Sequence, residues 1–170
     1  GKTYIVAEVG INHNGDVEIA KRLIRAAEFA GSDAVKFQKR TPRISTPRPE
    51  WDRLRDTPWG VMSYIEYREH VELSIEAYSE LAELAFSLEL GFIVSVWDWV
   101  ALNEILGLSN YPTALKIPSA MLTNHKLVEY VATISKPIIL STGMSTMIEI
   151  DAAAAIVRVA NRQAENVLLH

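Results

Sequence analysis

Two lysines stand in the middle of short apolar runs, where an ammonium group is costly to bury. Lys36 lies in DAVKFQKR and Lys116 lies in ALKIPSA, and an unpaired buried ion is destabilising by several kcal/mol. Two ammonium groups that converge on one pocket would bind an anion such as a phosphate or a carboxylate. Two alternatives remain open. Each lysine could pair with a buried carboxylate such as Glu8 or Asp98, or one lysine could form a Schiff base with a carbonyl substrate.

Three further polar side chains are expected to join the lysines. Strand alternation places Gln38 on the same face as Lys36, and Ser119 closely follows Lys116. Ser141 follows another apolar run in LSTGMS, where Gly143 permits close backbone approach and the amides at a helix start attract phosphate. The alternative for this last stretch is an ordinary strand-to-helix turn whose hydroxyl groups cap the following helix.

A carboxylate and an imidazole lie close together near the start of the chain. Glu8 falls in the first apolar run, and His13 follows it in NHNG. Such a pair could transfer protons or orient sugar hydroxyls, although a single histidine is also commonly a hydrogen-bonded structural residue. His70 and His125 have no partner at ligand spacing and His170 is the last residue, so we predict no metal site from these residues.

Alternating elements must hold these side chains in place. Six apolar runs of strand length, mostly without polar alternation, predict strands buried on both faces; they are residues 4–9, 34–38, 91–96, 114–117, 137–140 and 166–169. Five segments with helical spacing lie between them, at 17–30, 74–89, 100–108, 126–135 and 148–162. Asp16 and Gly31 are expected to cap the first helix, and Thr146 with Glu149 forms a capping-box pattern. The alternation predicts a parallel sheet with right-handed crossovers.

Both an open doubly wound sheet and a barrel fit this order of elements. The first strand is followed by EVGINHNG at residues 8–15, which lacks the glycine spacing of a dinucleotide-binding turn. Polar residues instead cluster at the ends of several strands, as at the rim of a barrel. We therefore predict an α/β fold of the TIM-type (β/α)8 class, truncated to about the first six strands, with residues 1–170 forming one partial barrel domain.

One segment, residues 41–73, interrupts the alternation. It contains four prolines together with tryptophans, tyrosines and interleaved charges. Connections this long inside a compact domain are usually functional or mobile. We weigh two interpretations: an extended loop wrapped over the barrel with a short helix near 65–72, or a lid over the substrate.

Composition narrows the class of protein. The 170 residues are 49% apolar and 22% charged, with a formal net charge of −4; this describes one globular domain and gives no general affinity for nucleic acid or anionic membranes. The chain has no cysteine, so disulfides and thiolate catalysis are excluded. No apolar run spans a bilayer and no signal-peptide layout is visible, so we expect a cytoplasmic protein.

Five motifs together resemble one known family. AEVGINHNG, DAVKFQKR, LKIPSA, KPIILSTGMS and NVLLH are similar, in sequence and in spacing, to the N-terminal barrel of the sialic acid synthase family. That family includes N-acetylneuraminate synthase and other nonulosonic acid synthases. The resemblance implies that phosphoenolpyruvate condenses with an N-acetylated amino sugar, such as N-acetylmannosamine, to give a nine-carbon keto acid with release of phosphate.

The resemblance also implies roles for the candidate residues. Lys36, Lys116, Ser119 and Ser141 would hold the phosphate and carboxylate of phosphoenolpyruvate. Glu8 and Gln38 would lie at the reacting end near the sugar, and His13 is included with them as a catalytic candidate. A divalent metal, manganese or magnesium, is implied, with its ligands outside this chain.

The sequence departs from the family pattern in two respects, and these limit which of the family's properties can be expected of this chain. Met121 stands where many members have a glutamate that is thought to help handle the amino sugar. The chain also ends at His170, before the last barrel strands and the C-terminal antifreeze-like domain of the family, so we expect the isolated segment to be inactive. Its two open sheet edges predict a homo-oligomer. The alternatives are another phosphoenolpyruvate-dependent aldol-type synthase and a non-catalytic sugar-acid binding module.

Overall fold

The core of the protein is one parallel sheet, seen here in a computed structural model that describes residues 3–134, 137–160 and 167–169. Its strands are β1 (Val6–Gly10), β2 (Ala34–Lys39), β5 (Gly91–Val96), β6 (Ala114–Ile117), β7 (Ile138–Leu140) and β8 (Val167–Leu169). They pair in the order β1-β2-β5-β6-β7-β8, and every pair is parallel. All six predicted strands are therefore confirmed, with end residues shifted at several of them; residue 166 lies outside the described residues.

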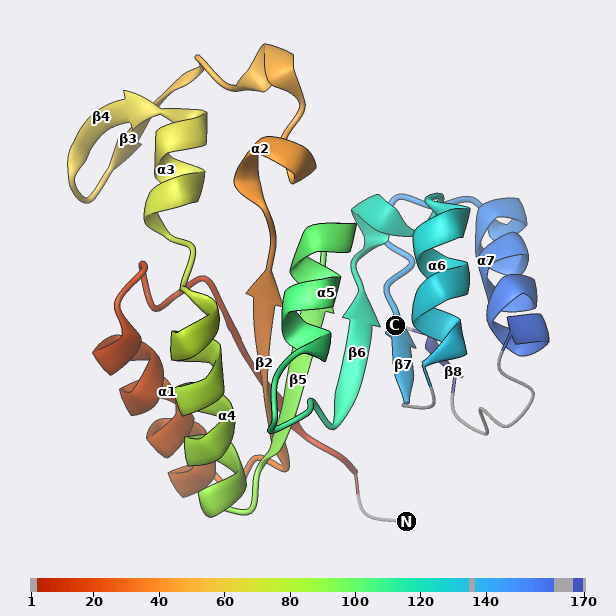
Figure 1. Cartoon of the computed structure of the whole chain (residues 1–170), viewed down its shortest axis with the longest axis horizontal. Coiled ribbons are helices and arrows are strands. Elements are labelled where there is room, and N and C mark those ends of the chain that lie inside the picture. The colour runs from red at the N-terminus through yellow and green to blue at the C-terminus, as the bar shows by residue number, and fades with distance from the viewer. Residues whose placement is uncertain (1–2, 135–136, 161–166, 170) are drawn as a thin grey trace.

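A helix connects each pair of neighbouring strands and lies along one side of the sheet (Figure 1). These helices are α1 (Val17–Phe29), α4 (Ile75–Ser87), α5 (Trp99–Leu106), α6 (His125–Thr133) and α7 (Met147–Ala160), which confirms the five predicted helices. The predicted caps form: Asp16 accepts hydrogen bonds from the backbone N–H groups of Glu18 and Ile19 at 2.7 and 3.0 Å. The Thr146 N–H donates to the Glu149 carboxylate at 2.7 Å and the Glu149 N–H donates to Thr146 Oγ1 at 3.4 Å, which forms the predicted capping box. The predicted helix ends at 135 and 162 fall outside the described residues.

The sheet has two apolar faces of unequal size. The helix-covered face supplies Phe37, Phe92 and Leu115, fully buried, to the main core. The opposite face, which we call the inner face, carries a small cluster of Ala34, Ile93 and Ala114, with Val6 and Ile139 packed against it. The strand order never reverses and the helices keep to one side, whereas a doubly wound sheet reverses and is covered on both faces.

Residues 41–73, which we call the excursion, project beyond the carboxyl end of β2 at the top of Figure 1. They form α2 (Pro42–Ser45), the 3-10 turn η1 (Arg48–Glu50), β3 (Leu54–Thr57), β4 (Gly60–Ser63) and α3 (Tyr64–His70). The predicted short helix is confirmed as α3. The expectation of an extended loop is wrong for the rest, because β3 and β4 pair as an antiparallel hairpin.

The described strands leave β1 and β8 as the two edges of the sheet and do not close into a barrel. No helix within the described ranges is long and apolar enough to cross a membrane.

Candidate active site

A polar layer sits two residues beyond the apolar cluster of the inner face, toward the carboxyl ends of the strands. Side chains two apart on a strand share a face, so each member of the apolar cluster has a polar successor. The successors of Val6, Ala34, Ile93, Ala114 and Ile139 are Glu8, Lys36, Ser95, Lys116 and Ser141. The carboxyl end of a parallel sheet is where such folds bind their ligands, so this layer is our candidate site.

Lys36 is the most buried cation of this layer. Its side chain is 8% exposed, and its ammonium group pairs with the carboxylate of Glu8, which is 49% exposed. The Lys36 Nζ atom also lies 3.5 Å from Ser95 Oγ. One of the alternatives raised for the lysines therefore holds in part, since Glu8 does pair with Lys36. That carboxylate remains half exposed at the mouth of the site.

Lys116 lies beside Lys36 and has no ion pair with a carboxylate in the described part of the chain. Burial lowers the pKa of Lys116, and the neighbouring Lys36 charge lowers it further, while Glu8 opposes the shift. The other carboxylate considered, Asp98, binds elsewhere: it accepts hydrogen bonds from the Thr41 backbone N–H at 2.7 Å and the Ala101 N–H at 2.9 Å. Two ammonium groups thus share one partly exposed carboxylate, which leaves a positive charge for an anion.

The two candidate serines come from neighbouring loops. A Cβ atom added to Gly143 would lie 3.5 Å from Ser119 Oγ, so the 141–145 turn packs directly against Ser119. The Ser141 backbone N–H donates to the Ile117 carbonyl at 3.0 Å, which ties the turn after β7 to the end of β6. Both serines are partly buried. The sequence predicted this neighbourhood from the order of the strands.

Gln38 and Glu8 meet above Gly10. A Cβ atom on Gly10 would lie 3.1 Å from Glu8 Oε1 and 3.3 Å from Gln38 Nε2, and the residue has a φ of +56°. Glycine is favoured there because it permits positive φ and because a side chain would crowd both polar groups. The pair offers an acceptor and a donor at one point of the rim.

His13 is placed differently from the other candidates. It is 1% exposed, its ring stacks on Phe37 at 6.0 Å, and its Nδ1 atom accepts a hydrogen bond from the Gly15 N–H at 3.1 Å. Burial lowers the pKa of His13, and the Gly10 carbonyl partly opposes this shift. These contacts organise the turn after β1.

Sequence reasoning missed a buried charged group next to the site. Arg40 is 1% exposed; its Nε lies 3.0 Å from Glu72 Oε1, and its guanidinium donates to Gln38 Oε1 and stacks on Trp97 at 4.8 Å. Lys39 lies 3.2 Å from Glu104 and 3.9 Å from Glu72. Burial raises the pKa of Glu72 to about 7, against the opposing charges of Arg40 and Lys39. The only local signal was the Lys39-Arg40 pair at the end of β2, and nothing in that pair indicates its distant partners.

Met121 follows Ser119 in the 3-10 turn η2 (Ser119–Met121). Its side chain is partly buried and packs against the main apolar core. An apolar side chain suits that contact, which accounts locally for methionine at this position.

No group of three or more histidine, cysteine, aspartate or glutamate side chains that could hold a metal occurs within residues 3–134, 137–160 and 167–169. The resemblance places the ligands of its divalent metal outside this chain, and we assign no chemical step to a metal here.

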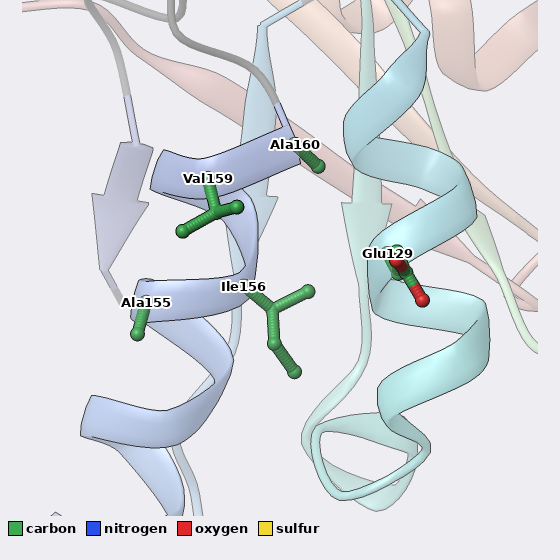
Figure 2. Close-up of a pocket in the computed structure, with 5 residues that line it drawn as sticks. All are labelled: Glu129, Ala155, Ile156, Val159 and Ala160. Atoms are coloured by element: carbon green, nitrogen blue, oxygen red, sulfur yellow. The ribbon is translucent and has the colours of Figure 1, made fainter.

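A separate pocket lies in the helical layer, between α6 and α7 (Figure 2). It is lined by Glu129, Ala155, Ile156, Val159 and Ala160. Four of these five side chains are apolar, and all five belong to helices rather than to the strand ends. This pocket offers no group suited to holding a phosphate and is not the candidate site.

Comparisons with known proteins agree on one relationship. The family model described as NeuB family matches residues 23–170. The N,N'-diacetyllegionaminic acid synthase of Campylobacter jejuni is 37% identical over 175 residues, covering 99% of this chain and 51% of that protein. The N-acetylneuraminate-9-phosphate synthase of Drosophila melanogaster is 38% identical over 146 residues, covering 85% of this chain and 38% of that protein.

A solved structure gives the same result. The crystal structure of the N-acetylneuraminic acid synthetase from Leptospira borgpetersenii, in complex with citrate, superposes with a TM-score of 0.80 at 25% identity. The match covers 94% of this chain and 51% of that one. The chain thus spans about half, or less, of the length of these relatives.

Proposed function

The chain belongs to the NeuB family, and from that premise we propose that the whole protein condenses phosphoenolpyruvate with an N-acetylated amino sugar. The product would be a nonulosonic acid, and inorganic phosphate would be released. Relatives named as legionaminic acid and neuraminate phosphate synthases support this reaction class. N-acetylmannosamine or a close relative is the acceptor that we propose.

One observation carries the proposal: the ammonium groups of Lys36 and Lys116 lie side by side and share a single, half-exposed carboxylate. A phosphate or carboxylate of phosphoenolpyruvate placed there would neutralise the excess charge through charge-assisted hydrogen bonds. Ser119 and Ser141 stand close enough in the fold to complete the cradle. This arrangement is the expected one for a small phosphorylated acid.

The proposed chemistry follows from these positions. The methylene carbon (C3) of phosphoenolpyruvate attacks the carbonyl carbon of the sugar, and the sugar oxygen takes up a proton. Water adds to C2, the carbon that carries the phosphate ester, and the bond from C2 to the phosphate oxygen then breaks to give the keto acid and inorganic phosphate. Lys36 and Lys116 would stabilise the negative charge on the departing phosphate, which preorganised donors do effectively. Glu8 and Gln38 would contact the oxygen of the sugar at the reacting end.

We also propose the larger architecture. The described sheet supplies the first six strands of an eight-stranded barrel, and the remaining strands would come from sequence outside these residues. The divalent metal of the family would take its ligands from those strands as well. A cytoplasmic homo-oligomer that acts on small molecules is our proposal for the whole protein.

Isotope transfer tests the reaction. The full-length protein that carries this chain is incubated with N-acetylmannosamine and phosphoenolpyruvate labelled with ¹⁸O in the bridging C–O–P position. We expect the label in inorganic phosphate and a nine-carbon keto acid by mass spectrometry. Absence of phosphate release with N-acetylmannosamine and with related acetamido sugars would contradict the proposal. Turnover with a phosphorylated aldose alone would instead favour another aldol-type synthase.

A further inference from the structure

The amide of Gln38 is held in one orientation by its neighbours. Gln38 Oε1 accepts a hydrogen bond from a terminal guanidinium nitrogen of Arg40. A guanidinium has donors and no acceptor, so the amide oxygen must face Arg40 and the NH2 group must face away from it. That NH2 group lies above Gly10, next to Glu8.

Arg40 is itself held from two directions. Its Nε lies 3.0 Å from Glu72 Oε1, and its guanidinium lies 4.8 Å from the centre of the Trp97 ring. Glu72 lies near the end of the excursion, two residues after α3. At 1% exposure, Arg40 is shielded from solvent and from any ligand. Its contacts therefore act on the site only through Gln38.

We propose that Arg40 is a positioning residue that locks the Gln38 amide with its NH2 group toward Glu8. Locked in this way, the rim presents one donor, Gln38 Nε2, beside one acceptor, Glu8 Oε1. A sugar hydroxyl can donate to Glu8 and accept from Gln38 at the same time, so the pair selects a hydroxyl at that point. The identity of the ligand rests on the proposed function, whereas the orientation of the amide is a property of this chain.

Side-chain NMR tests the orientation without any activity. The chain contains two glutamines, Gln38 and Gln163, so ¹⁵N-glutamine labelling of the 170-residue chain gives two NH2 pairs. The Gln38 pair is assigned by its loss in Gln38→Glu, and Gln163 serves as the internal reference. In Arg40→Met we expect solvent exchange of the Gln38 NH2 protons to rise about tenfold or more. In Arg40→Lys, which keeps a cationic donor, we expect most of the protection to return.

Two controls separate positioning from general disruption. Arg43→Met removes an exposed arginine that pairs with Glu69, and the Gln38 signals should not change. Where Arg40→Met fails to fold, Glu72→Met gives the second test, because it removes the carboxyl group that holds Arg40 without adding a third glutamine. Unchanged Gln38 exchange in a folded Arg40→Met protein, or in Glu72→Met in its place, would overturn the inference.

Kinetics of the full-length protein complete the test. A misplaced catalytic-site group is worth up to about 100-fold in rate, so we expect Arg40→Met to lower kcat with the sugar by roughly 10- to 100-fold. The KM for phosphoenolpyruvate should stay unchanged, and Arg40→Lys should recover most of kcat. A shift confined to the KM for phosphoenolpyruvate would contradict the positioning role. If the wild-type protein lacks turnover while Arg40→Met shows the expected change in Gln38 exchange, the proposed function is refuted and the positioning inference stands.

Discussion

The inner face and the excursion both concentrate charge, but they neutralise it differently. Every arginine of the excursion lies against a carboxylate or an aromatic ring: Arg43 with Glu69 and Trp51, Arg48 with Trp51, Arg53 with Glu50, Arg55 with Tyr64 and Tyr67, and Arg68 with Tyr64 and Trp97. On the inner face, Lys36 and Lys116 share the single carboxylate of Glu8.

This difference separates structural charge from ligand-binding charge. Arginine stacks on aromatic faces and pairs with carboxylates in fixed geometry, so each arginine of the excursion has a partner within the protein. The two lysines are compact point charges near one another, and their arrangement is electrostatically unfavourable until an anion joins them. Arg40 belongs with the structural charges, because its partners are all protein groups: Glu72, Trp97 and Gln38.

Replacing the central lysine should have the largest effect. In Lys36→Met, a charge-assisted contact worth ~3 kcal/mol is lost, so the affinity for phosphoenolpyruvate should fall about 100-fold. The free energy of unfolding should stay the same or rise, because a buried charge is removed and Glu8 can be solvated. Calorimetric titration and urea denaturation give the two values. Lys21→Met, on α1, is the matched control, since Lys21 pairs with Glu18 and Glu80 away from the site.

A loss of stability equal to the loss of affinity would remove the distinction between the two regions. It would mean that the Lys36 contact with Glu8 stabilises the fold in the same way as the ion pairs of the excursion.

The strands and the lysine pair could be predicted because their signals are local. A lysine inside a short β-branched run is visible in a few residues, and strand alternation then assigns its face. Successive βα units put the carboxyl ends of neighbouring strands together, so Ser119 and the 141–145 turn followed from order alone. The pairing of Lys36 with Glu8, rather than with Asp98, needed coordinates, because Asp98 is used to cap α5.

The excursion and Arg40 could not be predicted because their contacts are not local. Arg40 meets Glu72, 32 residues later, and its stacking partner is Trp97. The strands β3 and β4 are mostly exposed and lack apolar alternation, so their pattern did not indicate a hairpin. The hairpin instead makes a contact with α3 that is distant in sequence: the Trp59 ring lies tilted against the His70 ring, with ring centres 3.9 Å apart.

The free energy of unfolding should depend on pH through Glu72, the carboxyl group that connects the excursion to Arg40. The pKa of Glu72 is raised from 4.5 to about 7 by burial. Between these values the folded protein keeps a proton that the unfolded chain has lost, so stability falls as pH rises, by ~1.4 kcal/mol per pH unit from this group. Urea denaturation from pH 4.5 to 7.5 should show this slope in the wild type relative to Glu72→Gln. Parallel curves for the two proteins would refute the buried, protonated carboxyl.

Exposed Glu69, which pairs with Arg43, provides the control. Glu69→Gln should leave the pH slope of the wild type unchanged.

The affinity for phosphoenolpyruvate at alkaline pH should report the protonation of Lys116. The pKa of Lys116 is lowered below 10.5 by burial and by Lys36, so the free site loses its charge at lower pH than an ordinary lysine. A bound anion favours the charged form, and the affinity for phosphoenolpyruvate should therefore fall by up to about tenfold per pH unit above the lowered pKa. In Lys116→Arg the charge persists and this decrease should disappear. An alkaline decrease that is identical in Lys116→Arg would assign the titration to another group.

The smallest effect is expected within the excursion itself. Arg55 lies over the rings of Tyr64 and Tyr67 at 5.1 and 5.2 Å, and exposed stacking of this kind contributes ~0.5–1 kcal/mol. Arg55→Ala should therefore speed hydrogen exchange of the β3 and β4 amides by roughly two- to fivefold and leave phosphoenolpyruvate affinity unchanged. Arg25→Ala, exposed on α1, should change neither. Arg55 stacks on two tyrosine rings and contacts neither lysine of the site. A lower affinity in Arg55→Ala would therefore mean that the positive charge of the excursion acts on the ligand over a distance.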